Sequence, residues 1–249
     1  MSTKVTDPNA KGSSGFLWGI VALLVIIAAV IGYIVWNGQG AKTADVADVE
    51  AAEVAMTMET ENGNITLSSD KATESTPTVE LFEDFSCPHC SELAIATDDD
   101  MKTAIESGKL NVTIRPLNFL DGKDLENQQG HSTKAVAAME ALADSGDVKT
   151  YWNLRSYLFV HQNDVYNKWD MKDFADAAKR LGADDSTVEA IKNADIKALG
   201  NTIAAANAKE LEEETGTLSS PRIIYDGADL IGENESMADW VAKAEEIKA

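Results

Sequence analysis

The hydrophobic pattern of the chain begins with one long apolar run and then changes to short periodic segments. Residues 16–36 are 21 consecutive residues without a charged side chain. As an α-helix they would extend about 31 Å, which matches the thickness of a bilayer core. Trp18, Tyr33 and Trp36 lie near the ends of the run, where interfacial aromatic residues are common. A cleaved signal peptide usually has a shorter apolar region followed closely by a small-residue cleavage site, so the run predicts a membrane anchor.

Apolar and polar residues alternate with the period of a β-strand in several later segments. Asn62 and Gly63 separate the first two of these segments and form a dipeptide typical of a tight hairpin turn. The pattern therefore predicts a hairpin followed by further strands of a sheet. The expected strands are 54–61, 65–67, 78–82, 110–115, 221–225 and 229–231.

Helical periodicity dominates the stretch from His131 to Thr215. Glycine and aspartate residues divide it into candidate helices, which are 132–143, 148–161, 171–181, 186–193 and 196–214. Two more helices are expected outside this stretch, one after residue 87 that ends near Gly108 and one over residues 237–247. Because the helical block interrupts the strands of one α/β pattern, it predicts an insertion within one fold rather than a second domain.

Both cysteines of the chain lie in the sequence LFEDFSCPHCSE, residues 81–92. Cys87 comes between a predicted strand and a predicted helix. Its sulfur then faces the free N–H groups and the positive dipole end of a helix N-terminus, which favour a thiolate. Pro88 suits the first helical turn, where no N–H is needed, and Cys90 follows one turn deeper on the same face. The spacing allows the pair to cycle between dithiol and disulfide.

Other uses of two cysteines fit the sequence less well. A zinc site needs about four ligands, and the histidines are scattered at positions 89, 131 and 161. A c-type haem requires histidine directly after the second cysteine, where Ser91 stands. An iron–sulfur cluster usually needs more thiolates, and a structural disulfide that closes so short a loop removes little unfolded-state entropy. A redox-active pair is therefore favoured, with no cofactor beyond its own disulfide.

The chain resembles the thioredoxin-fold thiol–disulfide oxidoreductases of the DsbA type, in particular the membrane-anchored forms of Gram-positive actinobacteria. The resemblance is carried by FEDFSCPHC (82–90), by the helix-rich insertion and by SSPRIIYDG (219–227), and it covers about residue 53 to the C-terminus. It implies an α/β, thioredoxin-like fold with a large all-helical insertion over about 131–215, preceded by a single transmembrane helix. It also implies a membrane partner, DsbB- or VKOR-like, that reoxidises the pair.

The expected catalytic residues are Cys87, Pro88, His89 and Cys90. His89 is expected to stabilise the Cys87 thiolate by a hydrogen bond or by charge, and an exposed spacer is the alternative. The resemblance further implies a cis-proline at Pro221 that faces the redox pair and binds substrate together with residue 220. Serine stands at position 220, where the family often has valine or threonine.

A buried acid commonly precedes the first cysteine of the family by six residues, but Leu81 stands at that position. Side chains two residues apart in a strand point to the same face. Glu83 shares that face with Leu81 and is therefore our candidate for proton exchange with Cys90.

The charge distribution limits partners and sets the expected orientation. The formal net charge is −21, and residues 16–249 carry 19 basic against 41 acidic side chains, net −22. This large negative net charge indicates a soluble exterior domain and excludes nucleic acid binding. Lys4 and Lys11 precede the apolar run, so the positive-inside rule predicts a cytoplasmic N-terminus and an extracytoplasmic catalytic segment.

The expected organisation is a cytoplasmic tail (1–15), a transmembrane anchor (16–36), a linker (37–52) and a DsbA-like thioredoxin domain (53–249). The expected function is a membrane-anchored, extracytoplasmic oxidase that introduces disulfide bonds into unfolded exported proteins with cysteine thiols. Two alternatives stay open. One is a reductase or isomerase of the same fold, and the other is a non-catalytic, membrane-tethered binding module.

Overall fold

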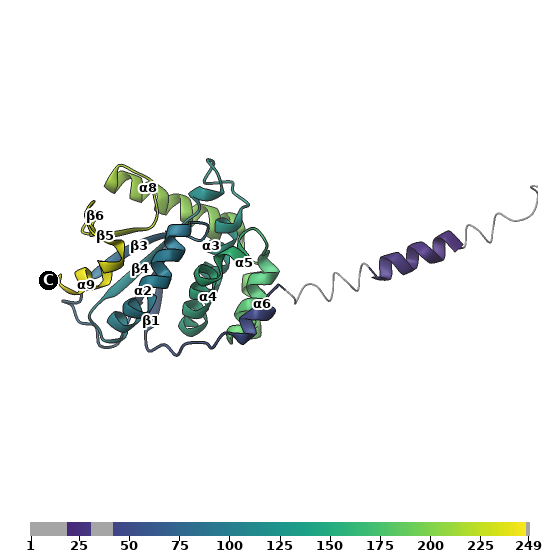
Figure 1. Ribbon diagram of the computed structural model, residues 1–249, viewed down its shortest axis with the longest axis horizontal. Coiled ribbons are helices and arrows are strands. Elements are labelled where there is room, and N and C mark those ends of the chain that lie inside the picture. The colour runs from purple at the N-terminus through teal and green to yellow at the C-terminus, as the bar shows by residue number, and fades with distance from the viewer. Residues whose placement is uncertain (1–18, 31–41, 248–249) are drawn as a thin grey trace, which may run out of the picture. The chain divides into compact units, whose positions relative to one another are not determined.

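The computed structural model of the chain describes residues 19–30 and 42–247 (Figure 1). The chain divides into two units, residues 1–42 and residues 43–249. Residues 19–30 of the first unit are helical and their apolar side chains are exposed. Within the described ranges, no helix is both long enough and apolar enough to cross a bilayer. The predicted anchor (16–36) extends beyond residues 19–30 at both ends, and the predicted tail (1–15) lies outside the described residues.

The described part of the second unit is built on one six-stranded sheet with the order β1-β2-β4-β3-β5-β6. Strands β3 and β4 are parallel, and all other neighbouring strands are antiparallel. Asn62 and Gly63 both have positive φ and close the predicted hairpin between β1 and β2. The strands are β1 (Thr57–Glu61), β2 (Asn64–Ser68), β3 (Thr78–Asp84), β4 (Asn111–Leu117), β5 (Arg222–Tyr225) and β6 (Ala228–Asp229).

Strand β3 lies between β4 and β5 and is covered on both faces. Val79, Leu81 and Glu83 are buried on one face. Phe82 points to the other face, where it packs against Leu117, Ile224 and two residues of α8. Strand β3 continues two residues beyond the predicted end, through Glu83 and Asp84, and both of these side chains are buried.

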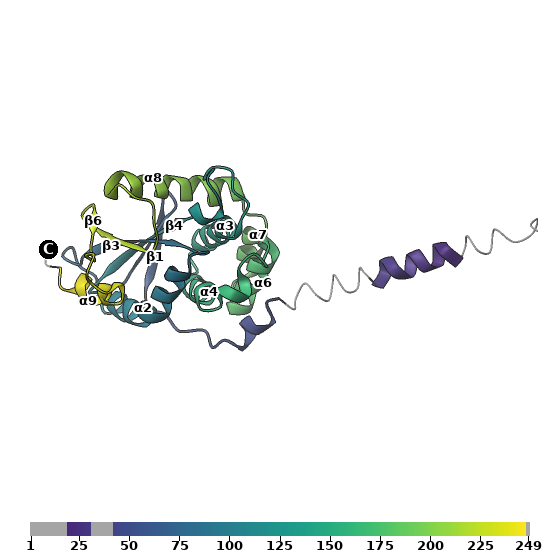
Figure 2. The same ribbon diagram turned by 45° about the horizontal axis from the view of Figure 1, so that its top comes forward.

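Helices cover both faces of the sheet. Figure 2 shows α2 and α9 on one side, α8 on the other, and α3, α4, α6 and α7 gathered at one end. The helices are α2 (Pro88–Glu106), α3 (His131–Ala143), α4 (Val148–Val160), α5 (Gln162–Val165), α6 (Met171–Leu181), α7 (Asp185–Lys192), α8 (Ile203–Thr215) and α9 (Trp240–Glu245). Short 3-10 turns are η1 (Ala44–Asp48), η2 (Phe119–Asp121) and η4 (Met237–Asp239), and η3 (Ile196–Thr202) is a π-helical segment.

The helical insertion over 131–215 is present, with two differences from the prediction. The short helix α5 was not expected after α4. The predicted helix 196–214 is divided into η3 and α8, because Gly200 packs directly on α3. A Cβ atom at Gly200 would lie 2.5 Å from the carbonyl oxygen of Thr133. The wider π-helical segment presents this glycine to the neighbouring helix.

The second half of the predicted linker is attached to the domain rather than free of it. Thr43 and Val46 are buried, and η1 packs against α6. Both backbone groups of Ala52 bond the side chain of Asn153 on α4, at 2.7 Å and 2.9 Å. The backbone N–H of Ala55 donates to Glu106 at 2.8 Å. We call residues 43–56 the N-terminal strap.

Candidate active site

The redox pair lies at the start of α2, as the sequence predicts. Cys87 is the N-cap residue with extended backbone dihedrals, and Pro88 is the first helical residue. The Cys87 N–H donates to the carbonyl oxygen of Asp84 at 2.9 Å, and the Cys87 carbonyl accepts from Cys90 and Ser91. These bonds fix the turn that joins β3 to α2.

The two thiols have opposite acidities. The Cys90 thiol donates to the Cys87 sulfur, which is the main reason that the pKa of Cys87 is lowered from 9.0 to about 5. Burial opposes this shift, and the backbone N–H groups of Cys90 and His89 support it. Burial raises the pKa of Cys90 far above that of an ordinary thiol, because a thiolate there would lie in apolar surroundings next to the Cys87 charge. At neutral pH Cys87 is therefore mainly a thiolate, and Cys90 is a protonated thiol.

Pro221 meets the redox pair from the opposite side. The Ser220–Pro221 peptide bond is cis, and the Ser220 carbonyl oxygen lies 3.4 Å from Cys87 Sγ. Strand β5 starts at the next residue, where Arg222 pairs with Phe82 of β3. The predicted cis bond and its position beside Cys87 are both confirmed.

The imidazole of His89 pairs with Glu92 at the surface. Its Nδ1 lies 2.9 Å from Glu92 Oε2, and the two side chains are 76% and 72% exposed. The hydrogen bond and the charge of Glu92 raise the pKa of His89, and the Cys87 thiolate adds a smaller effect in the same direction. The backbone N–H of His89 acts on Cys87 more directly than its imidazole. A catalytic role for the imidazole stays a prediction.

A comparison with protein-family models gives a match over residues 72–244 to a model described as thioredoxin. The chain belongs to the thioredoxin family. The matched region contains the redox pair, the helical insertion and the cis-proline segment. The membership therefore covers every residue of the site that has been described above.

Two solved structures of the thioredoxin fold resemble the chain over nearly their whole length. Both are MdbA proteins, named thiol-disulfide oxidoreductases. The protein from Corynebacterium diphtheriae is 41% identical, with a TM-score of 0.73, and the match covers 80% of this chain and 98% of that one. The protein from Corynebacterium matruchotii is 38% identical, with a TM-score of 0.74, and the match covers 82% and 98%. DsbA from Mycobacterium tuberculosis, at 20% identity and a TM-score of 0.58 over 73% and 91%, shares the fold.

The curated relatives that the chain matches are longer proteins. The serine/threonine-protein kinase PknE of Mycobacterium tuberculosis is 28% identical over 171 residues, which are 67% of this chain and 29% of that protein. The chain thus spans less than a third of PknE.

The helical insertion contributes a site residue that the sequence analysis missed. Gln162, the first residue of α5, donates from Nε2 to the carbonyl oxygens of Phe85 and Cys87, at 2.9 Å and 3.0 Å. Nearby, the Ser91 hydroxyl donates to the carbonyl of Phe159 at 2.6 Å. These bonds tie the end of α4 to the start of α2. No local pattern marks Gln162, which lies 75 residues from Cys87.

Asp84 is an acid near the pair to which the sequence analysis assigned no role, and it lies on the face of β3 opposite to Glu83. Its carboxylate accepts from the Ser132 hydroxyl and from the N–H groups of Ser86 and Leu120. Burial raises the pKa of Asp84 from 3.8 to about 7, and the bond from Ser132 is the largest opposing effect. Asp84 thus connects the redox turn to α3 and to the loop after β4.

Glu83 lies on the same face of β3 as Leu81, as the strand period requires. Its two oxygens bind Arg155 of α4, from Nε at 2.8 Å and from Nη2 at 2.6 Å. A small cavity is lined by Glu83, Cys90 and Arg155, among other residues. The predicted proximity of Glu83 to Cys90 is present, and its role in proton exchange stays a prediction.

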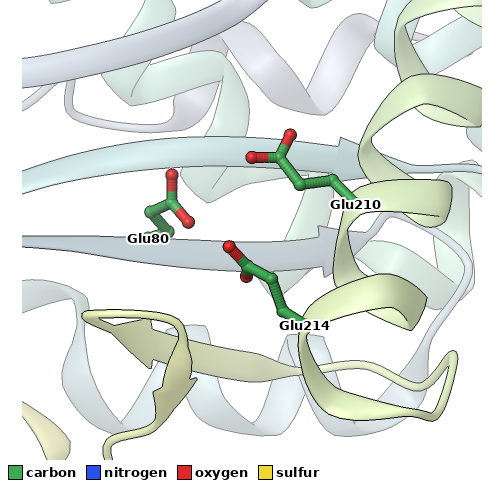
Figure 3. Close-up of side chains that lie close together, drawn as sticks. All are labelled: Glu80, Glu210 and Glu214. Carbon is green, nitrogen blue, oxygen red and sulfur yellow. The ribbon is translucent and has the colours of Figure 1, made fainter.

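One group of carboxylates in the described residues has the spacing of a cation site. Glu80, Glu210 and Glu214 place oxygens within 4.8 Å of one another, and Figure 3 shows the two side chains of α8 directed towards Glu80 on its strand. Arg115 binds Glu80 at 2.9 Å and also binds Glu210. Arg115 therefore forms an ion-pair network with two of the three carboxylates, those of Glu80 and Glu210.

Proposed function

We propose that this chain is an extracytoplasmic, membrane-anchored thiol–disulfide oxidoreductase that introduces disulfide bonds into exported proteins through Cys87 and Cys90. One observation carries the proposal. Two thiols one helical turn apart have a lowered pKa at Cys87, about 5, and a raised pKa at Cys90. The MdbA proteins, whose names state thiol–disulfide oxidoreductase activity, support it.

The chemistry starts from the Cys87–Cys90 disulfide. A substrate thiolate attacks Cys87 Sγ, the bond to Cys90 breaks, and Cys90 Sγ leaves with the electron pair and takes up a proton. A second substrate thiolate then attacks the substrate sulfur of the mixed disulfide, and Cys87 leaves as a thiolate. The substrate is oxidised by two electrons and the enzyme is reduced. Because the pKa of Cys87 is about 5, its sulfur leaves as a stable thiolate at neutral pH and does not have to take up a proton.

A groove beside the redox pair supplies the substrate-binding surface. It has a volume of about 450 Å³ and is lined by His89, Leu93, Ser220, Pro221 and Met237, among other residues. An extended polypeptide in this groove runs past the backbone of Ser220, two residues before the start of β5. The contact lies within reach of Cys87, because the Ser220 carbonyl is 3.4 Å from its sulfur.

The cellular setting rests on the sequence. The uncharged residues 16–36, preceded by Lys4 and Lys11, support a single span with a cytoplasmic N-terminus. The domain then meets exported chains as they emerge. Each cycle leaves the pair reduced, so a membrane oxidant of the DsbB or VKOR type restores the disulfide.

The test is the reduction potential of the pair, measured by equilibration of the purified protein with glutathione. Stabilisation of the reduced form by the Cys87 thiolate makes the protein more oxidising than glutathione, above about −200 mV. A potential near that of thioredoxin, about −270 mV, would favour the reductase alternative. A pair that does not exchange with glutathione would favour the binding module.

A further inference from the structure

Asp84, the last residue of β3, contacts both cysteines through its backbone. Its carbonyl oxygen accepts from the Cys87 N–H at 2.9 Å. Its own N–H lies 3.5 Å from the Cys90 sulfur. Only Phe85 and Ser86 separate this residue from the start of the redox helix. A displacement of the Asp84 backbone is therefore passed to both sulfur atoms.

The carboxylate of Asp84 joins this backbone to three separate segments. Oδ1 accepts from the Ser86 N–H at 2.9 Å and from the Ser132 hydroxyl, and Oδ2 accepts from the Leu120 N–H at 3.2 Å. Ser86 belongs to the turn before Cys87, Ser132 to the first turn of α3, and Leu120 to η2. The hydroxyls of Ser86 and Ser132 also bond each other at 2.6 Å. We call these four residues the Asp84 network.

The chemistry of the Asp84 network requires a carboxylate. An ionised carboxylate is an acceptor on both oxygens, so it takes three donors at once. An amide at this position would direct its NH₂ group against one of them. The side chain of Asp84 is fully buried, and an unpaired buried donor is costly. Without the carboxylate, the turn before Cys87 would therefore shift towards other acceptors.

The acidity of Cys87 depends on donors that this turn aligns. The Cys90 thiol donates to the Cys87 sulfur, and the N–H groups of Cys90 and His89 support the same shift. Such bonds weaken steeply when the donor and the acceptor are misaligned. A residue that fixes the turn therefore acts on the thiolate although its own side chain bonds other groups.

We propose that Asp84 is a positioning residue of the redox site, whose carboxylate holds the turn between β3 and α2 in the geometry that aligns the donors on Cys87. Alignment stabilises the thiolate, hence the reduced form, and makes the disulfide more oxidising. The inference rests on the proposed function, because it concerns the same pair. It gives a role to a buried carboxylate that takes no part in the exchange steps.

Positioning and charge predict opposite effects for the removal of Asp84. Burial raises the pKa of Asp84 to about 7, and the charge of Asp121 acts in the same direction. The carboxylate is therefore mainly ionised at pH 8. A negative charge near a thiol disfavours its thiolate, so loss of the charge alone would make the pair more oxidising. Loss of the alignment would make it less oxidising.

The experiment compares Asp84→Ala with the unchanged protein by equilibration with glutathione at pH 8 and by thiolate absorbance. The pKa of Cys87 should rise by about one unit, the effect of about one lost bond to a charged group. The equilibrium constant with glutathione should change about tenfold, which lowers the reduction potential by about 30 mV. A change in folding stability alone would move neither value.

Asp121→Ala is the matched control. The Asp121 carboxylate also accepts three hydrogen bonds at the start of α3, from the Ser132 N–H and from the N–H and the hydroxyl of Thr133. None of these donors belongs to the turn before Cys87. Both variants should lose folding stability, but Asp121→Ala should leave the potential and the pKa of Cys87 unchanged.

An unchanged potential in Asp84→Ala, an equal change in Asp121→Ala, or a more oxidising pair would overturn the inference. If Asp84→Ala does not fold, Ser132→Ala removes one of the three donors. It should lower the potential by a smaller amount, and an unchanged or raised potential there would be the same refutation. The potential of the unchanged protein tests the proposed function separately, because the inference concerns only the difference between variant and unchanged protein.

Discussion

Cys87 and Cys90 are the same chemical group one helical turn apart, yet their surroundings differ in almost every respect. Cys87 lies at the helix N-terminus, where the Cys90 thiol and two backbone N–H groups donate to its sulfur. Cys90 lies inside the domain beside a carboxylate pair and a small cavity. Position along the first turn of α2, rather than residue type, therefore sets the pKa of each thiol. The predictions below test how completely the two roles are separated.

The largest expected effect comes from removing one sulfur at a time. Cys90→Ala should accumulate reductant-sensitive adducts with exported cysteine-containing proteins, because Cys87 still exchanges with oxidised partners but cannot clear them internally. Cys87→Ala should accumulate almost none, since Cys90 is buried and protonated. Non-reducing gels of the two variants, followed by identification of the trapped proteins, measure the difference. Equal trapping by both would remove the distinction between the two cysteines.

The second effect is the pH dependence of the stability of the reduced protein and of the ionisation of Cys87. The pKa of Cys87 is lowered from 9.0 to about 5 in the folded state. Its thiolate therefore contributes stability that is fully present above about pH 9 and is lost as the pH falls through about 5. Thiolate absorbance should show a midpoint near pH 5, and chemical unfolding of the reduced protein should lose this contribution progressively between about pH 9 and about pH 5.

Two variants control the pH experiment. Cys87→Ser should abolish the absorbance change and the associated pH dependence of stability. His89→Ala should raise the pKa of Cys87 only slightly, because the imidazole is exposed and paired with Glu92 while the backbone N–H of residue 89 is retained. A large rise in the pKa of Cys87 in His89→Ala would show that the imidazole of His89, rather than its backbone N–H, stabilises the thiolate. A Cys87 midpoint near that of a free thiol, about 8.5, would contradict the oxidase proposal.

The smallest expected effect is at Gln162. Gln162→Leu removes the donor to the Phe85 and Cys87 carbonyls and should lower the free energy of unfolding by about 1–3 kcal/mol. It should also raise the pKa of Cys87, because the first turn of α2 is held less firmly, and leave Cys90 protonated. Denaturant unfolding and thiolate titration measure the two effects. Asn163→Leu, at the exposed neighbouring position, is the control, and an equal change there would contradict a specific role for Gln162.

The parts of the site that sequence reasoning predicted are those with a local signal. The redox pair at positions 87 and 90 was predicted from a strand-to-helix transition that contains a proline. The face of β3 on which Glu83 lies was predicted from the two-residue period of a strand. Pro221 required resemblance, because a proline before a strand does not by itself indicate a cis bond. The hairpin at Asn62 and the helical block were predicted for similar local reasons.

The missed residues depend on contacts between distant segments. Gln162 reaches Cys87 over 75 residues, Ser132 reaches Asp84 over 48, and Arg155 reaches Glu83 over 72. Nothing in the local sequence of α3, α4 or α5 indicates that these side chains contact β3 or the start of α2. The attachment of the strap was missed for the same reason. A Gly-, Ala- and Asp-rich segment predicts a tether, and the complementary groups of Asn153 lie 101 residues away.

The attachment of the N-terminal strap decides how a pulling force would enter the domain. Tension applied to the chain at Thr43 first loads its contact with Arg180 of α6 and then the paired bonds between Ala52 and Asn153 of α4. Both contacts end in the helical insertion. The load therefore passes into α4 and α6 before it reaches β1 or the redox helix. The chain that enters the domain at Thr43 is thus anchored on α6 and α4 before it continues into β1.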